Sequence, residues 1–180
     1  MAISTKPEFE FLKLDPTSAS DAEQKFQERV KHYDLMISQE LAKLDKKDPL
    51  RNPLLATMKQ INDYRHVLEY FLTAIESPVD GMESTRMYSI LSDKKVEGVF
   101  SYHIEEDSLF VETILSSPDN VFGKDRIKGI GTSCIEKIKT IALDSGVMKI
   151  QLSPTELSKP FYEKLGFVYD GTTNKFEMCL

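Results

Sequence analysis

Residues 126–132 read Arg126-Ile127-Lys128-Gly129-Ile130-Gly131-Thr132, and they lie at the centre of the stretch from Ser116 to Leu143 that decides the fold. An apolar segment typical of a strand, Leu109 to Leu115, precedes them, and a helical pattern begins near Ile130. Two glycines one residue apart let the backbone approach a ligand without a Cβ in the way, and their amides continue into the unpaired N–H groups of the helix. A phosphate or pyrophosphate suits this set of donors, and Arg126 and Lys128 add positive charge beside it.

Two familiar nucleotide-binding loops do not fit this spacing. A Walker loop ends in Gly-Lys-Ser or Gly-Lys-Thr, whereas the only Gly-Lys pair of the chain is followed by Asp125. A dinucleotide-binding fingerprint needs Gly or Ala where the chain has Cys134, and an acidic residue about twenty positions later, where it reads Ile-Gln-Leu-Ser at 150–153. An ordinary tight turn between a strand and a helix remains the alternative for a lone Gly-x-Gly.

The pattern that remains is Arg-x-x-Gly-x-Gly after a strand, followed about thirty residues later by Phe-Tyr-Glu-Lys-Leu-Gly-Phe at 161–167. Together the two motifs resemble the GNAT family of acyl-CoA-dependent N-acetyltransferases over about the last hundred residues. The resemblance implies that the glycine loop holds the CoA pyrophosphate and that pantetheine lies in a gap between strands 109–115 and 148–152. Backbone groups left in such a gap need partners, which the pantetheine amides would supply. The cofactor-binding residues implied in this way are Thr113, Leu115, Arg126, Ile127, Lys128, Gly129, Ile130, Gly131, Thr132 and Lys159.

The second motif supplies a candidate for proton transfer. Acetyl transfer to an amine needs a neutral amine, donors for the oxyanion and a proton for the departing thiolate. Tyr162 matches the tyrosine that many family members place near the sulfur, so the resemblance implies that it is the proton donor. The alternative is an aromatic residue that merely packs on a helix. The sequence departs from the family at two points: Thr155 stands where Asn is frequent, and residues 118–125 lengthen the loop before Arg126.

A general base is also required, because a free alkylamine has a pKa near that of lysine, about 10.4. Glu112 is the only charged residue in the strand 109–115, and alternation would place it opposite Val111 and Thr113. We therefore expect a desolvated carboxylate with a raised proton affinity. The alternative is a solvent-facing residue or a structural ion pair. His103, on the neighbouring predicted strand, is the second candidate because histidine titrates in the useful range.

The periodicity predicts an α+β fold with a mixed, mostly antiparallel sheet in a single domain of residues 1–180. Two amphipathic helices separated by a break at 46–49 form a predicted hairpin at 20–76, followed by the sheet and acyl-CoA-binding core at 85–180. Ser20 and Glu23 form a predicted capping box for the first helix, Asn52-Pro53 begins the second and Ser77-Pro78 ends it. A helix follows the glycine loop and a short C-terminal helix begins at Ser158. Strands are predicted at 8–14, 87–91, 96–104, 109–115, 148–152, 167–169 and 175–180, with a parallel pairing across the glycine-loop helix.

Composition limits the remaining function classes. A chain of 180 residues with 41% hydrophobic content fits one domain. Its two cysteines provide neither a disulfide framework nor metal-ligand spacing, so we expect a reducing, cytoplasmic setting and no metal. Residues 1–7 lack an apolar core followed by a cleavage site, and no apolar run approaches the length of a membrane span. We therefore expect a soluble protein with no cleaved secretory signal and no membrane contact. The net charge of −6 argues against nucleic acid as a partner.

From the resemblance we expect an acetyltransferase that uses acetyl-CoA as co-substrate and a primary amine as acceptor, by direct attack. The acceptor is expected to be a cationic small molecule, a protein lysine or a protein N-terminus, because the chain is acidic. The alternative is a catalytically silent GNAT-like fold that binds CoA or a protein partner, with the helical hairpin as the interaction surface. The sequence does not fix the oligomeric state and leaves a homodimer open.

Overall fold

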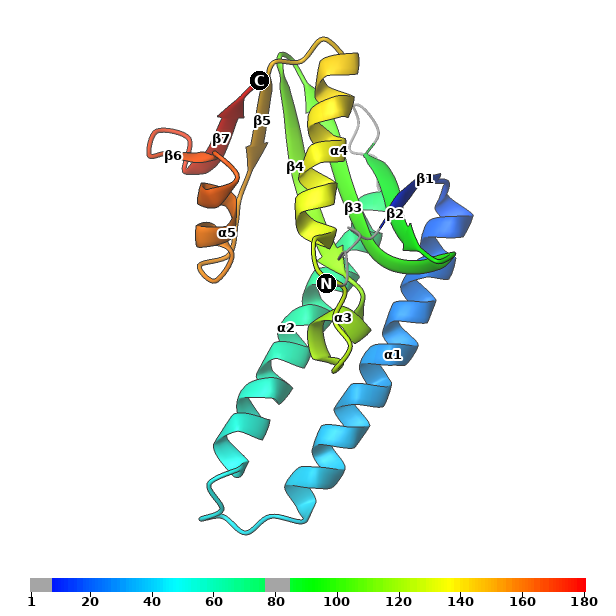
Figure 1. Ribbon diagram of the computed structural model, residues 1–180, viewed down its shortest axis with the longest axis vertical. Coiled ribbons are helices and arrows are strands. Elements are labelled where there is room, and N and C mark those ends of the chain that lie inside the picture. The colour runs from blue at the N-terminus through cyan, green and yellow to red at the C-terminus, as the bar shows by residue number, and fades with distance from the viewer. Residues whose placement is uncertain (1–7, 77–84) are drawn as a thin grey trace, which may run out of the picture.

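The computed structural model describes residues 8–76 and 85–180, and it confirms the predicted α+β fold (Figure 1). Seven strands form one sheet in the order β1-β2-β3-β4-β5-β7-β6, in which the β4–β5 pairing is parallel and the others are antiparallel. The strands are β1 (Glu10–Leu14), β2 (Arg86–Ser92), β3 (Lys95–Glu105), β4 (Ser108–Ser116), β5 (Lys149–Leu152), β6 (Val168–Asp170) and β7 (Lys175–Cys179). The helices are α1 (Pro16–Ala42), α2 (Arg51–Glu76), α3 (Pro118–Phe122), α4 (Ile130–Asp144) and α5 (Lys159–Lys164).

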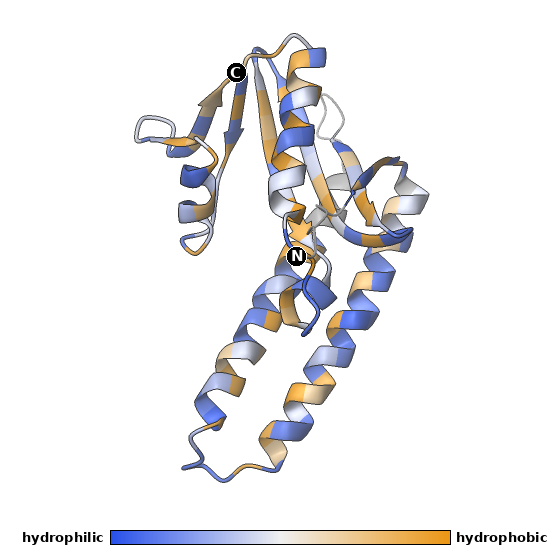
Figure 2. Cartoon of the chain, viewed as in Figure 1, coloured by the Kyte–Doolittle hydropathy of each residue, from blue (hydrophilic) through white to orange (hydrophobic). Residues whose placement is uncertain are grey.

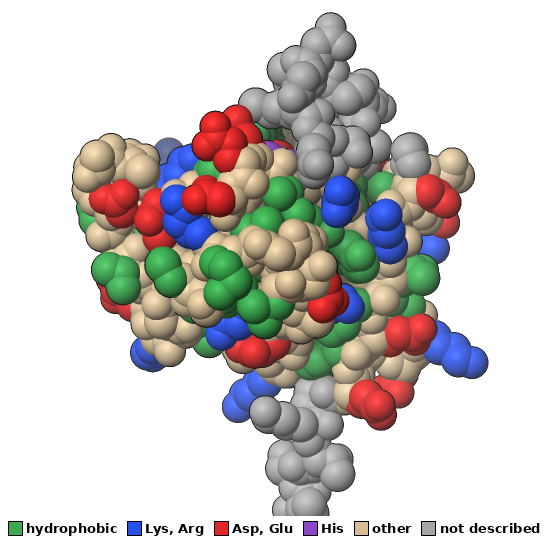
Figure 3. Space-filling view, turned by 90° about the horizontal axis from the view of Figure 1, so that it is seen from above, with side chains coloured by type: hydrophobic (Ala, Val, Ile, Leu, Met, Phe, Trp, Pro, Cys, Tyr) green, Lys and Arg blue, Asp and Glu red, His purple; other side chains and the backbone are tan. Residues whose placement is uncertain are grey.

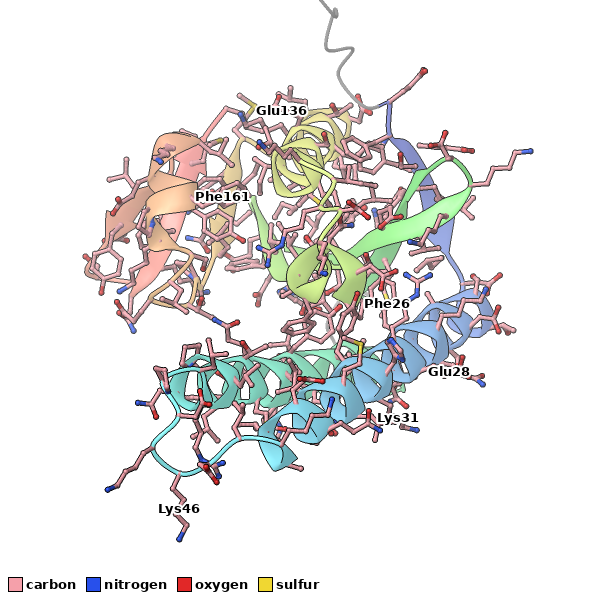
Figure 4. All side chains as sticks on the ribbon, turned by 60° about the horizontal axis from the view of Figure 1, so that its bottom comes forward. Phe26, Glu28, Lys31, Lys46, Glu136 and Phe161 are labelled. Atoms are coloured by element: carbon pink, nitrogen blue, oxygen red, sulfur yellow. The ribbon has the colours of Figure 1, made fainter. Side chains whose placement is uncertain are left out.

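Helices α1 and α2 form the predicted hairpin, and much of its length extends beyond the sheet (Figure 1). Hydrophobic and hydrophilic residues alternate along both helices (Figure 2), so each has one apolar stripe for packing. At the end near the sheet, this stripe buries Phe26, Val30, Ile61 and Leu68 against Met87, Val99 and Leu115. Lys46 marks the turn between the helices, at the far end from the sheet (Figure 4).

Both hairpin helices begin earlier than predicted. The N-cap of α1 is Asp15, whose side chain accepts a hydrogen bond from the Ser18 amide at 2.8 Å. Pro16 occupies the first turn with its φ already suited to a helix, so Ser20 and Glu23 lie inside α1 instead of capping it. Helix α2 begins at Arg51, after the Asp48 carboxylate accepts from the Leu50 amide at 2.8 Å. The predicted end at Ser77-Pro78 lies outside the described residues.

Helix α4 covers the opposite face of the sheet and forms the larger core. The buried residues of α4 pack against β3, β4 and β5. On α4 they include Ile130, Cys134, Ile135, Ile138 and Ala142, and on the strands they include Phe100, Leu109, Val111 and Ile150. Gly98 of β3 lets the first turn of α4 come close, because a Cβ there would meet Ile130 Cγ2 at 3.1 Å and the Leu115 carbonyl oxygen at 3.1 Å. The start of α4 is therefore fixed against the sheet.

Strands β4 and β5 pair over only part of the length of β4. The parallel register joins residues 108–111 of β4 to residues 149–152 of β5, whereas β4 continues to Ser116. Pro154 follows β5 and has no N–H group with which to extend the ladder. The two strands diverge below their paired segment in Figure 1, and the N-terminus of α4 and helix α5 lie at this end of the sheet.

The segment between β4 and the glycine loop is more ordered than the long loop that we expected. Residues 118–122 form the short helix α3, which begins with Pro118 in its first turn. Asp119 of α3 accepts hydrogen bonds from the Tyr33 hydroxyl at 3.1 Å and from Lys95 Nζ at 3.0 Å. These contacts tie α3 to both α1 and β3, and the sequence separation of the partners explains why the pattern alone does not predict them.

The face at the end of the molecule away from the hairpin carries hydrophobic side chains among acidic and basic ones (Figure 3). Leu143, near the end of α4, and Met148, just before β5, are each 54% exposed.

Within residues 8–76 and 85–180, none of the helices combines the length and the apolar character that a membrane span requires.

The close approach at Gly98 generates a prediction about stability. Gly98→Ala should lower the free energy of unfolding by about 1–3 kcal/mol, because the added methyl group overpacks a site bounded by a backbone oxygen. Urea denaturation followed by circular dichroism measures this change. Gly171→Ala is the matched control, since its Cβ would meet its nearest neighbour at an ordinary 3.9 Å. Equal midpoints for the two variants would show that the approach at Gly98 is not tight.

Candidate active site

The first glycine of the loop is required by its backbone conformation. Gly129 is the N-cap of α4 and has φ 92° and ψ −2°, in the left-handed region that other residues avoid. Its carbonyl oxygen accepts from the Ser133 amide at 2.9 Å, which begins the helical hydrogen bonds. No side chain caps this end of α4. The amides of the first turn are therefore available to a ligand that accepts hydrogen bonds.

The second glycine is required by space. Gly131 has no positive φ, but a Cβ at this position would meet the tip of the Phe161 ring at 2.9 Å. Phe161 is on α5 and lies on the side of that helix toward α4 in Figure 4, with 36% of its surface exposed. The ring thus rests on the first turn of α4, a contact that the sequence motif does not reveal. The two glycines of one motif serve two different physical needs.

The basic residues near the loop have different surroundings. Arg126 and Lys128 are exposed, and Arg126 Nε donates to the Gly123 carbonyl oxygen at 3.3 Å. Lys159, which the resemblance adds to the cofactor site, instead pairs with Glu156 at 2.6 Å. Thr155, at the position where the family often has Asn, is exposed, and its Oγ1 lies 3.0 Å from Ser158 Oγ. Positive charge is available on the loop itself, while the Lys159 ammonium is directed to its own acidic neighbour.

The remaining predicted cofactor residues lie where the sheet opens. Thr113 and Leu115 belong to the part of β4 that continues beyond the last pair with β5, Val111 and Leu152. Both side chains are buried, and that of Leu115 packs toward the helical hairpin. On the β5 side, this part of β4 has no strand partner among the described residues. Its backbone is therefore a candidate to pair with an extended ligand.

Tyr162 lies in α5 against the α4 core. Its ring meets that of Phe167 edge to face, with centroids 5.6 Å apart. Burial, with a smaller contribution from Cys134, raises the pKa of Tyr162 to about 12, so the phenol is neutral at neutral pH. Among the described residues, no hydrogen-bond partner occupies its hydroxyl. The side chain is thus both packed as an aromatic residue and able to donate a proton.

The two candidate bases form one pair. His103 Nδ1 lies 2.9 Å from Glu112 Oε1, and the two side chains are only 15% and 18% exposed. The His103 ring stacks on Phe110, with centroids 5.0 Å apart, and Thr85 Oγ1 lies 3.4 Å from Glu112 Oε1. The other oxygen, Glu112 Oε2, is buried without a hydrogen-bond partner among the described residues. A buried acceptor of this kind has the capacity to take a further N–H donor.

Strand β4 contains an irregularity at Glu112. Ser101 pairs with Thr113, but the next residue, Tyr102, pairs with Val111, so Glu112 is an extra residue in β4. Val111 packs in the α4 core, whereas Glu112 contacts His103 on the other face of the sheet. Glu112 thus lies opposite Val111 as expected, and the extra residue interrupts the alternation between Val111 and Thr113.

Two polar residues near the site escaped the sequence analysis. Glu97 of β3 is only 3% exposed, and Asn120 of α3 accepts a hydrogen bond from the Ile127 amide of the glycine loop at 2.7 Å. The sequence signals only that Glu97 is a charged residue in a largely apolar strand, and this does not identify Asn120, 23 residues away, as its partner.

Among the described residues, no group of three or more His, Cys, Asp or Glu side chains is arranged to hold a metal ion.

Comparison with known proteins places this geometry in a structural class. No protein-family model and no curated protein matches the sequence significantly. Among solved structures, the PaiA N-acetyltransferase from Thermoplasma acidophilum, in complex with coenzyme A, is 16% identical with a TM-score of 0.54, and the match covers 96% of this chain and 99% of that one. A protein from Exiguobacterium sp. 255-15 assigned as an acetyltransferase is 18% identical with a TM-score of 0.52, over 96% of this chain and 93% of that one.

A third solved structure identifies the fold as that of one acetyltransferase family. A protein from Desulfovibrio desulfuricans assigned to the GNAT family of acetyltransferases is 10% identical with a TM-score of 0.50, over 96% of this chain and 99% of that one. The chain therefore has an acetyltransferase fold. More particularly, it has the GNAT fold, and the likeness includes the N-terminal helical hairpin as well as the last hundred or so residues that carry the motifs.

Proposed function

We propose that this protein is an acetyltransferase that transfers an acetyl group from acetyl-CoA to a primary amine. One observation carries the proposal: β4 leaves β5 after Val111, beside the uncapped N-terminus of α4. Unpaired strand backbone and helix amides at one end of a sheet suit a ligand with a pyrophosphate and an extended amide chain. In this proposal residues 1–180 act as a single acetyltransferase domain.

The cofactor would lie along these elements in two parts. The amides of residues 128–132 would hold the pyrophosphate, with Arg126 and Lys128 as exposed positive charges beside it, while the Ile127 amide donates to Asn120 Oδ1. The backbone at Thr113 and Leu115 would pair with pantetheine, and Lys159 would turn from Glu156 to a phosphate. The Thermoplasma acidophilum protein of the same fold was solved with coenzyme A, which supports this choice of cofactor.

The chemistry would use three side chains. The ammonium form of the acceptor loses a proton to the His103–Glu112 pair, directly or through a water, and the lone pair of the resulting neutral amine attacks the thioester carbonyl carbon. The nitrogen of the tetrahedral intermediate then loses its extra proton to solvent, and the intermediate collapses with cleavage of the C–S bond. Tyr162 gives its proton to the departing thiolate and regains one from solvent. The neutral phenol that burial maintains at Tyr162 is the protonation state that this step needs.

The proposed acceptor is cationic in solution: a small amine, a protein lysine or a protein N-terminus. The net charge of −6 favours such an acceptor in the encounter. The unpartnered Glu112 Oε2 favours it in the bound state, because an ammonium or amine N–H would satisfy a buried acceptor. A silent CoA-binding protein is the other candidate, but the buried, unpartnered acceptor at Glu112 and the neutral phenol of Tyr162 favour the enzyme.

The proposed function predicts turnover of acetyl-CoA only when an amine is present. A panel of diamines, amino sugars, lysine peptides and peptides with free N-termini should contain at least one acceptor that releases free CoA, measured with a thiol reagent. The rate at subsaturating acceptor should fall with added salt if charge attracts the amine. Binding of acetyl-CoA without turnover across the panel would favour the silent protein, and a neutral or anionic best acceptor would contradict the proposed acceptor class.

Binding at the glycine loop can be tested with a pair of glycines. Gly129→Glu should weaken acetyl-CoA binding by at least about a hundredfold, because a carboxylate would stand where the phosphates bind. Gly146→Glu is the matched control: it also replaces a glycine of positive φ, 72°, but at the other end of α4 with open space around it. Isothermal titration calorimetry of the folded variants compares them, and equal affinities would contradict the site.

Tyr162→Phe should lower kcat by roughly a hundredfold to ten-thousandfold, the range of general acid catalysis, with acetyl-CoA affinity nearly unchanged. The change keeps the aromatic packing and removes only the hydroxyl. Tyr70→Phe, at an exposed position of α2, provides the control variant. Steady-state kinetics that give a wild-type kcat for Tyr162→Phe would assign proton donation to water or to another group.

The base should appear in the pH dependence of kcat/KM. A base acts only when deprotonated, so the rate should rise with pH through its pKa, and Glu112→Gln should abolish or shift this ascending limb. His103→Gln tests the partner, because His103 Nδ1 lies 2.9 Å from Glu112 Oε1, and His66→Gln, exposed on α2, tests for a general effect of losing a histidine. An ascending limb that is unchanged in both site variants would exclude the pair as the base.

A further inference from the structure

A buried carboxylate organises the segment that precedes the glycine loop. Glu97 of β3 is 3% exposed, and its Oε2 accepts hydrogen bonds from Ser117 Oγ at 2.9 Å and from Asn120 Nδ2 at 2.7 Å. Its backbone oxygen accepts from the Ser117 amide at 2.7 Å, and Lys95 Nζ lies 3.4 Å from Oε1. A buried charge is tolerated only when it is satisfied in this way.

Asn120 connects this carboxylate to the loop. Its Nδ2 is held by Glu97, which can only accept, so the amide oxygen must point the other way. That oxygen, Oδ1, accepts from the Ile127 amide at 2.7 Å. Ile127 lies between the two basic residues of the loop and two positions before the N-cap Gly129. The side chain of Asn120 thus fixes a backbone group that no helix or strand holds.

The helix that carries Asn120 is itself held in place. Asp119 receives hydrogen bonds from Tyr33 and Lys95, and Arg29 Nη1 lies 3.4 Å away. Burial acts to raise the pKa of Asp119, but the Lys95 hydrogen bond and the Arg29 charge outweigh it and bring the pKa below its usual range. The carboxylate is therefore ionised at neutral pH, and α3 is fixed to α1 and β3 by charged hydrogen bonds.

We infer that Asn120 is a positioning residue for the cofactor: it holds the Ile127 amide, and with it the glycine loop, in the conformation that binds the pyrophosphate. Glu97 orients Asn120, and α3 carries it. This inference rests on the proposed function for the identity of the ligand. Preorganised donors bind an anion more tightly than mobile ones, because less motion is lost on binding. The loop conformation itself depends only on the hydrogen bonds within this chain.

Two variants of the same network separate positioning from stability. Asn120→Ala removes the bond to Ile127, whereas Ser117→Ala removes a buried hydroxyl that binds Glu97 and Asn120 but not the loop. Both should lower the melting temperature. Only Asn120→Ala should raise the KM and the Kd for acetyl-CoA, by about tenfold or more, with kcat at saturation within about twofold of wild type. Amide hydrogen exchange should show faster exchange at Ile127 in Asn120→Ala, with α4 and β3 still protected.

The outcomes distinguish this inference from the proposed function. Faster exchange at Ile127 together with a selective rise in the acetyl-CoA KM supports it. Unchanged exchange at Ile127, or equal KM effects in the two variants, overturns it. If wild type binds no acetyl-CoA in calorimetry, the proposed function fails and the ligand of the inference fails with it. Exchange at Ile127 then still decides whether Asn120 holds the loop.

Discussion

The site depends on the unequal lengths of two neighbouring strands. β4 has nine residues and β5 has four, so β4 is paired on both sides over its first half and only with β3 over its second half. Backbone groups within a sheet need partners, and the unpaired half of β4 provides a row of them next to the start of α4. The extra residue, Glu112, falls in the same half of the strand, and its carboxylate contacts His103. The candidate cofactor backbone and the candidate base thus lie in the same half of one strand.

Three glycines bring the surrounding elements to this point, each for a separate reason. Gly98 admits Ile130 and fixes the height of α4 above the sheet, Gly129 turns the chain into the helix, and Gly131 admits the ring of Phe161 from α5. A larger residue would destabilise the fold in a different way at each position. It would overpack the contact at Gly98, strain the backbone at Gly129 and displace the Phe161 ring at Gly131. The spacing of the two motif glycines in the sequence therefore does not show that one is required by its backbone conformation and the other by a side-chain contact.

The sequence predicted the parts that depend on local patterns. Alternation and glycine spacing identified the strands 87–91, 96–104 and 109–115, the start of α4 near Ile130 and the GNAT fold, all of which the structure confirms. It misplaced the starts of α1 and α2, because several residues could cap each helix and only the fold selects Asp15. The roles of Tyr162, Glu112 and His103 stay predictions, although the structure pairs the last two. The Glu97–Asn120 bond joins residues of different elements, and no periodicity reports such a contact.

The short β4–β5 ladder also governs how the C-terminal part of the molecule is attached. Strands β5, β7 and β6, together with α5, join the rest of the sheet through four residue pairs, whereas β3 and β4 share eight. Few backbone hydrogen bonds therefore resist a swing of this part about the β4–β5 junction. Such a swing would move Phe161 and Tyr162 together, away from the first turn of α4. The short ladder therefore attaches the part of the molecule that holds Tyr162, whereas the glycine loop follows the part that the longer β3–β4 ladder holds.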